Sequence, residues 1–147
     1  MRFHGLSIAV ALVIPVGPIH AETVPGDFLL SLLRFGVECR QATAPRKTYL
    51  GDATRFAVVV EQPATPSAEE KPPPSRVTYR AFYKDLAEPT ASDARVTMRC
   101  KGVSKCVAVY RGGTVERADA FQLSTCSPRT ATLVLGATRE LIRSATQ

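Results

Sequence analysis

Four cysteines are the side chains of this chain whose type and spacing could support chemistry: Cys39, Cys100, Cys106 and Cys126. They could form a redox centre, a zinc site or two structural disulfides. A redox centre is disfavoured because five residues separate Cys100 from Cys106, whereas thiol–disulfide exchange uses a Cys-x-x-Cys motif. A zinc site is disfavoured because Cys39 and Cys126 stand alone, whereas four-cysteine zinc sites usually contain two close pairs. The spacing therefore indicates structural disulfides.

The N-terminal segment indicates an oxidising compartment, where such disulfides persist. Arg2 precedes an apolar run at 6–16, and the small residue Ala21 follows it. This order is typical of a secretory signal peptide cleaved after Ala21. The run is shorter than the ~20 residues that a membrane-spanning helix needs, and Pro15 and Pro18 would break a helix there. We therefore expect residues 1–21 to be removed and the mature chain to be periplasmic or secreted, with no membrane span.

Residues 22–147 contain no histidine, the side chain that most often activates a serine or cysteine nucleophile. Both histidines, His4 and His20, lie in the segment expected to be removed, which excludes Ser-His and Cys-His catalysis and histidine-ligated zinc. No Gly-rich phosphate loop and no Gly-x-Ser-x-Gly or Ser-x-x-Lys motif occurs. The adjacent carboxylates Glu69 and Glu70 lie in a Pro-rich stretch and are interpreted as solvated. The sequence predicts no catalytic residue, no cofactor and no metal ligand, although paired carboxylates stay open.

The pairing of the cysteines can be tested against strand geometry. Segments 95–101 and 105–111 both have strand character, and an antiparallel hairpin between them would place Cys100 opposite Cys106. The same face would then carry only apolar side chains, namely Val96, Met98, Ala108 and Tyr110. Facing Cα atoms in such a pair lie within the range that a disulfide tolerates. The hairpin therefore favours Cys100–Cys106, which leaves Cys39 for Cys126.

A second pairing stays open at this point. In the chain-entropy model, the favoured pairing contributes about 7 kcal/mol, and Cys39–Cys100 with Cys106–Cys126 contributes about 7.6 kcal/mol. A difference of about 0.6 kcal/mol does not distinguish the two pairings. Only the hairpin pattern favours the first connectivity.

Two helices are expected, one near each end of the mature chain. Leu29, Leu32 and Leu33 recur at helical spacing behind Asp27, a plausible N-cap, and Gly36 is expected to end this short helix. A strand at 35–41 carrying Cys39 would follow. Ser127 and Pro128 form an N-cap and first-turn pair that predicts a helix from there to about residue 145.

Strands are predicted at 55–61, where β-branched residues dominate, and at 76–84, where Val77, Tyr79, Ala81 and Tyr83 alternate on one face. After the turn signal Gly112-Gly113, segment 114–124 can return antiparallel. A three-residue loop is favoured over a two-residue turn, since it places Ala118 and Ala120, and not Arg117 and Asp119, on the apolar face.

The segment 62–75 contains five prolines and no large apolar side chain. Such a segment cannot bury enough surface to offset its ordering entropy, so a flexible loop is predicted. Residues 22–147 are expected to form a single globular domain. Its fold class is predicted as α+β, an antiparallel sheet of four to six strands with a short N-terminal helix and a C-terminal helix, braced by disulfides.

The net charge indicates the class of partner. Without residues 1–21, 18 basic residues stand against 13 acidic residues, a net charge of +5, and 13 of the basic residues are arginines. Such a field favours anionic partners. Because the arginines are spread along the chain with no basic run, nucleic acid is disfavoured as a partner.

These observations predict a small exported, non-enzymatic binding protein whose target is an unknown protein or an anionic envelope component. The candidate contact surface consists of Arg95, Arg99 and Arg111. Three tyrosines, Tyr79, Tyr83 and Tyr110, could contribute to it, but they also fall on predicted apolar faces and could belong to the core. The alternative is a carboxylate-based hydrolase or an enzyme inhibitor acting in the envelope.

Residues 100–108, with the pattern Cys-x₅-Cys-Val-Ala, resemble a segment of small exported bacterial proteins of the invasion-associated locus B family. The similarity covers nine residues and has low specificity.

Overall fold

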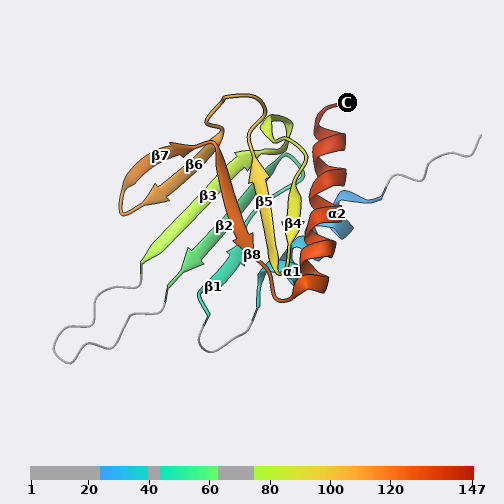
Figure 1. Ribbon diagram of the computed structural model, residues 1–147, viewed down its shortest axis with the longest axis horizontal. Helices are drawn as coiled ribbons and strands as arrows, with labels where there is room; N and C mark the ends of the chain where they lie inside the picture. The colour runs from blue at the N-terminus through green and yellow to red at the C-terminus, as the bar shows by residue number, and fades with distance from the viewer. Residues whose placement is uncertain (1–23, 40–43, 63–74) are drawn as a thin grey trace, which may run out of the picture.

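The computed structural model describes residues 24–39, 44–62 and 75–147, which contain two α-helices and eight strands (Figure 1). A five-stranded antiparallel sheet has the order β1 (Arg46–Tyr49), β2 (Arg55–Glu61), β3 (Arg76–Phe82), β6 (Val107–Arg111) and β7 (Thr114–Ala118). A three-stranded antiparallel sheet has the order β4 (Thr90–Ser92), β5 (Arg95–Arg99) and β8 (Ala120–Ser124). The helices are α1 (Gly26–Val37) and α2 (Pro128–Ala145), and a short 3₁₀ helix, η1 (Tyr83–Asp85), follows β3.

The two sheets face each other, and the helices close one side of the space between them (Figure 1). On the opposite side, only Asp119 separates β7 from β8, so the chain passes directly from one sheet to the other. Helix α1 packs on α2 and contacts β1, while α2 contacts β4, β5 and η1. Phe121 of β8 lies 5.2 Å from Phe56 of β2 and 5.8 Å from Tyr79 of β3, measured between ring centroids. The inner faces thus enclose one apolar core.

The predicted α+β class is confirmed, with antiparallel pairing, a helix near each end and two disulfides. The strands divide between two sheets, whereas the sequence predicted four to six strands in one. The predicted hairpin between 95–101 and 105–111 is wrong, because β5 pairs with β4 and β8 while β6 pairs with β3 and β7. Met98 consequently lies opposite Phe121 and not opposite Ala108.

The core-facing side of β6 also differs from the prediction. Val107 and Val109 are buried in the core cluster, whereas Tyr110 lies on the opposite, outer face and is 37% exposed. Val107 lies opposite Ala118 of β7, which packs against the core. Ala118 therefore faces the core as expected, while Arg117 projects to the outer face.

A two-residue turn joins β6 to β7, since Arg111 pairs with Thr114. Gly112 and Gly113 have φ angles of 53° and 84°, and a type I′ hairpin turn requires positive φ at both central residues. The predicted three-residue loop is therefore wrong. The polarity argument failed because it started from the wrong face of β6.

Helix α1 extends beyond the predicted stop at Gly36 and ends at Val37. The strand predicted at 35–41 is therefore wrong for its five described residues, because 35–37 are helical and 38 and 39 belong to no strand. Residues 40–43 lie outside the described part of the chain, as do 1–23 and 63–74, which include the predicted signal peptide and nearly all of the predicted Pro-rich loop.

Gly36 is buried where α1 crosses α2, and a Cβ added there would lie 2.3 Å from Cγ2 of Val134. Glycine therefore serves close helix packing at this position.

Helix α2 begins and ends as the sequence predicts. Ser127 is its N-cap, its hydroxyl accepts a hydrogen bond from the Thr130 backbone N–H, and the Thr130 hydroxyl accepts one from the Ser127 N–H. This reciprocal capping box satisfies two N–H groups that the helix cannot pair internally. Within the described residues, neither helix combines the length and apolar character needed to cross a membrane.

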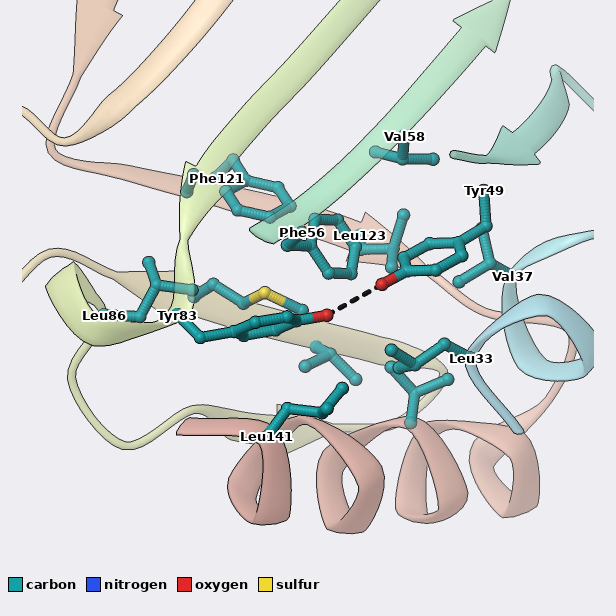
Figure 2. Packing of buried hydrophobic residues seen from close by; sticks show 14 of the residues in the cluster. Leu33, Val37, Tyr49, Phe56, Val58, Tyr83, Leu86, Phe121, Leu123 and Leu141 are labelled. Carbon is teal, nitrogen blue, oxygen red and sulfur yellow. Dashed lines mark hydrogen bonds between the residues drawn. The ribbon is translucent and has the colours of Figure 1, made fainter. Parts of the chain in front are cut away.

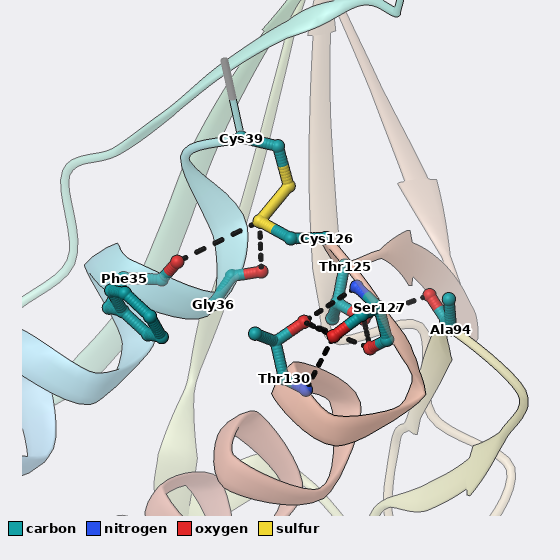
Figure 3. The surroundings of a disulfide bond; sticks show 8 residues. All are labelled: Phe35, Gly36, Cys39, Ala94, Thr125, Cys126, Ser127 and Thr130. Carbon is teal, nitrogen blue, oxygen red and sulfur yellow. Dashed lines mark hydrogen bonds between the residues drawn. A yellow bond between two sulfur atoms is a disulfide. The ribbon is translucent and has the colours of Figure 1, made fainter. Parts of the chain in front are cut away.

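Both disulfides have the connectivity that the sequence favoured. Cys100 and Cys106 are joined with their Cα atoms 5.6 Å apart, although they join two sheets and not two strands of a hairpin. Cys39, which follows α1, is joined to Cys126 between β8 and α2, with Cα atoms 5.3 Å apart (Figure 3). The Cys126 N–H also donates a hydrogen bond to the Gly36 carbonyl oxygen. The second disulfide thereby fixes the C-terminal end of α1 beside the start of α2.

A hydrogen-bonded tyrosine pair occupies the core between the sheet and the helices (Figure 2). The hydroxyl oxygens of Tyr49 and Tyr83 are 2.7 Å apart, and both side chains are buried. Burial raises the pKa of Tyr49 to about 12, and burial followed by the neighbouring Tyr49 raises the pKa of Tyr83. The pair satisfies two hydroxyl groups that would otherwise be buried without a partner.

Removal of the two disulfides should cost unequal amounts of stability. The sequence separations are 87 residues for Cys39–Cys126 and 6 for Cys100–Cys106. Loop-closure entropy then predicts losses of about 4.6 and about 2.4 kcal/mol for the respective double-alanine variants. Urea unfolding of both variants under the same conditions measures this difference. A larger loss for the short loop would show that interactions other than chain entropy dominate.

The tyrosine pair should make the fold sensitive to alkali. Between the unfolded pKa near 10 and the folded pKa of about 12, the unfolded chain loses the Tyr49 proton first. The free energy of unfolding should therefore fall as pH rises through this window, by about 1.4 kcal/mol per pH unit for each such tyrosine. Urea unfolding at several pH values tests this against a Tyr49→Phe/Tyr83→Phe variant, because other groups titrate in both proteins. An equal slope in the two would contradict the prediction.

Candidate functional site

The three arginines predicted as a contact surface lie on different sheets. Arg95 and Arg99 belong to β5 in the three-stranded sheet, while Arg111 ends β6 in the five-stranded sheet. All three are exposed. Arg95 and Arg99 share one face of β5, whereas Arg111 lies beside the glycine turn that joins β6 to β7. The structure places two of these residues on one surface and the third on another.

Of the three candidate tyrosines, two belong to the core. Tyr83 is fully buried, and Tyr79 stacks on Phe121 between the sheets. Tyr110 is exposed on the outer face of the five-stranded sheet. Only Tyr110 is therefore available to contact a partner.

The outer face of the five-stranded sheet carries a row of side chains that the sequence analysis did not single out. Arg80 of β3 lies opposite Ala57 of β2 and opposite Ala108 of β6, and Ala108 lies opposite Arg117 of β7. Residues directly paired on neighbouring strands project to the same face of a sheet. Arg80 and Arg117 therefore stand on one face with the small side chain of Ala108 between them.

A hollow of about 140 Å³ lies at this row. We call it the outer hollow, and its principal lining residues are Arg55, Arg80, Phe82, Ala108, Tyr110 and Arg117. Ala108 is only 7% exposed, whereas Phe82 is 50% exposed. The guanidinium carbon of Arg80 lies 4.8 Å from the centroid of the Tyr110 ring, within the range of a cation–π interaction. Tyr110 thereby holds one cationic group at the rim of the hollow.

The charges at the outer hollow are unequally compensated. Arg55 pairs with Asp52, with Nε 3.3 Å from the carboxylate oxygen. Among the described residues, neither Arg80 nor Arg117 forms an ion pair with a carboxylate. Two guanidinium groups without an acidic partner on one face provide planar donors for a carboxylate or a phosphate. The outer hollow can thus bind an anionic group.

The hollow does not resemble a carboxylate catalytic site or a metal centre. None of its lining residues is Asp or Glu. Within residues 24–39, 44–62 and 75–147, no group of three or more His, Cys, Asp or Glu side chains is placed to hold a metal ion. The chemistry available at the hollow is that of arginine, aromatic rings and backbone.

Sequence reasoning missed Arg80 and Arg117 for separable reasons. Arg80 alternates with the tyrosines of its strand, so its place on the outer face was available from the predicted strand at 76–84. Arg117 was set aside because the favoured loop gave β7 another register. Their proximity depends on the pairing of β3 with β6, strands that are not consecutive in sequence, and no local pattern contains that information.

Comparisons with known proteins identify no relative of this chain. No protein-family model matches it, and neither the curated proteins nor the solved structures contain a match. The function is therefore argued from the surface itself.

Proposed function

We propose that this protein is a small exported binding protein that holds an anionic group of its partner in the outer hollow. The observation that carries the proposal is the placement of Arg80 and Arg117 on either side of Ala108, without a carboxylate partner among the described residues. Exposed Phe82 and Tyr110 adjoin them. Arginine and aromatic side chains are the types that most often dominate the binding energy of protein surfaces.

The composition of the hollow supports binding over hydrolysis. A carboxylate-based hydrolase needs two acidic side chains that converge on one cleft, and the residues that line the hollow include none. The arginines instead offer a fork of N–H donors that can bind a carboxylate or phosphate in two places at once.

Export forms part of the proposal. Two disulfides brace the described fold, and disulfides of this kind persist in oxidising compartments. The N-terminal pattern Arg2, apolar run and Ala21 supports entry into such a compartment.

The exported protein should begin at Glu22 and contain no reactive thiol. Intact mass and N-terminal sequencing of protein recovered from the envelope or the medium check the cleavage, and thiol titration without reductant checks the disulfides. Recovery from the cytosol of a chain that begins at Met1 and has four reactive thiols would contradict export.

Loss of the two uncompensated arginines should weaken anion binding. Heparin serves as a probe because it is a polyanion, and wild-type protein should be retained on it at low salt and released as salt rises. The Arg80→Gln/Arg117→Gln variant should bind heparin at least about tenfold more weakly, since each charge-assisted contact contributes about 1.5–3 kcal/mol. Binding isotherms at fixed ionic strength measure the change.

Arg95→Gln/Arg99→Gln is the matched control, because it removes the same charge from the exposed face of β5. This variant should bind heparin nearly as well as wild type. An equal loss in both variants would mean that net charge alone drives retention. A loss confined to the control would place the site on the three-stranded sheet, on residues that the sequence analysis favoured, and would overturn the outer hollow.

A further inference from the structure

We propose that the partner is a protein, and that an extended segment of it pairs with the free edge of β7 as an added strand and places a carboxylate against Arg117. This inference rests on the proposed function and names the class of partner for the same surface. Strand addition supplies backbone hydrogen bonds for affinity, and alternate side chains supply specificity.

Strand β7 forms one edge of the five-stranded sheet (Figure 1). Because Arg111 and Thr114 flank a two-residue turn, Thr114 and Glu116 direct their backbone groups to β6, and Val115 and Arg117 turn theirs away. Among the described residues, no other strand pairs with that outer edge. Two residues therefore present unpaired N–H and C=O groups next to the outer hollow.

β7 lacks two of the usual protections of an edge strand, proline and a bulge, although it is short and carries the charges of Glu116 and Arg117. Natural edges are often interrupted by a proline or a bulge. β7 contains no proline, and all five of its residues pair in register with β6. Four of the five are exposed, and Val115 is 55% exposed. The edge is regular enough to receive another strand.

Strand β5 ends before it reaches the outer edge of β7. The Cys100 N–H donates to the Asp119 carbonyl oxygen, at the junction of β7 and β8. The next residue, Lys101, turns away, and its N–H donates to the Asp85 carbonyl oxygen. β5 thus pairs with β8 but stops before β7. An added strand would lie beside β7 in the same way that β5 lies beside β8.

Charge selects the side chains of the added strand. The row Arg80, Ala108 and Arg117 would gain a fourth member, directly opposite Arg117 and on the same outer face. A carboxylate at that position faces the arginine across the strands. Two residues away, an apolar side chain would lie opposite exposed Val115. The geometry therefore favours an extended segment with an acidic and an apolar residue at alternate positions.

A second copy of this chain fits the edge less well. In antiparallel pairing of two β7 strands, the residues that face outward must meet one another, which restricts the registers. The register with Val115 opposite Val115 opposes no like charges, but it places Gly113, and no carboxylate, opposite Arg117. The register with Val115 opposite Arg117 places Glu116 opposite Glu116 of the other copy, and the remaining register places Arg117 opposite Arg117. Like charges directly opposite are destabilising. An acidic segment meets no such repulsion at Arg117.

The Val115→Pro variant tests strand addition, since proline removes an N–H that faces away from β6 and is tolerated at strand edges. The probes are peptides selected from a displayed random library on immobilised wild-type protein. Selected peptides should be enriched in Asp or Glu alternating with apolar residues. Their Kd should rise at least tenfold with Val115→Pro and with Arg117→Gln, and should change little with Val115→Thr, which keeps the N–H.

A measurement on unmodified protein covers the case in which Val115→Pro fails to fold. Peptide binding should slow hydrogen exchange at the Val115 and Arg117 amides at least tenfold. Unchanged exchange there, or unchanged peptide affinity in a folded Val115→Pro variant, would overturn strand addition. Heparin binding by the same variant would then still report on the proposed function.

Two further outcomes would also overturn the inference. Selection of no acidic peptide by protein that binds heparin through Arg80 and Arg117 would indicate a non-protein anion as the ligand. A wild-type dimer that Val115→Pro converts to a monomer would indicate that a second copy occupies the edge.

Discussion

The passage of the chain between the two sheets at one corner is the constraint on which the rest of the structure depends. β5 and β6 are consecutive in the chain but belong to different sheets, and the same is true of β7 and β8. Both passages meet where Cys100 is bonded to Cys106 and its N–H donates to the Asp119 carbonyl oxygen. The Cys106 N–H also donates to the Cys100 sulfur at 2.9 Å. With this corner fixed, the inner faces meet, and Phe121 reaches the five-stranded sheet.

The same corner shapes the candidate surface. Cys106 lines the outer hollow and directly precedes β6, whose Ala108 separates the two uncompensated arginines. Because β7 leaves for the other sheet at Asp119, Arg117 stands near the end of its strand. Thus the arrangement that encloses the core also sets two cationic groups beside an open edge.

Local signals in the sequence predicted the features that depend on neighbours along the chain. Ser127 and Pro128 marked the start of α2, and the apolar spacing marked α1, although Gly36 was misread because its burial against Val134 is a tertiary contact. The division into two sheets could not be predicted, since alternation shows which residues share a face but not which strand lies beside them. Cys100 and Cys106 were paired correctly from a hairpin that does not exist, because close approach of two chain segments permits a disulfide in either arrangement.

The candidate site was harder to predict from the sequence than the fold was. Tyr110 was named as a contact candidate and is exposed, but Arg80 and Arg117 become neighbours only through the order β3-β6-β7. Glycines with positive φ at 112 and 113 decided the register of β7, whereas polarity had suggested another. A surface built across non-consecutive strands requires the topology before its members can be recognised.

The Cys39–Cys126 disulfide also decides how the molecule would respond to tension. The eight strands of the described residues lie between these two cysteines along the chain, while α1 and α2 lie outside the loop that the bond closes. A force applied through the two helices would pass along the sulfur–sulfur bond and bypass both sheets. The helices could be peeled away, but the strands that carry the arginine face would bear no load.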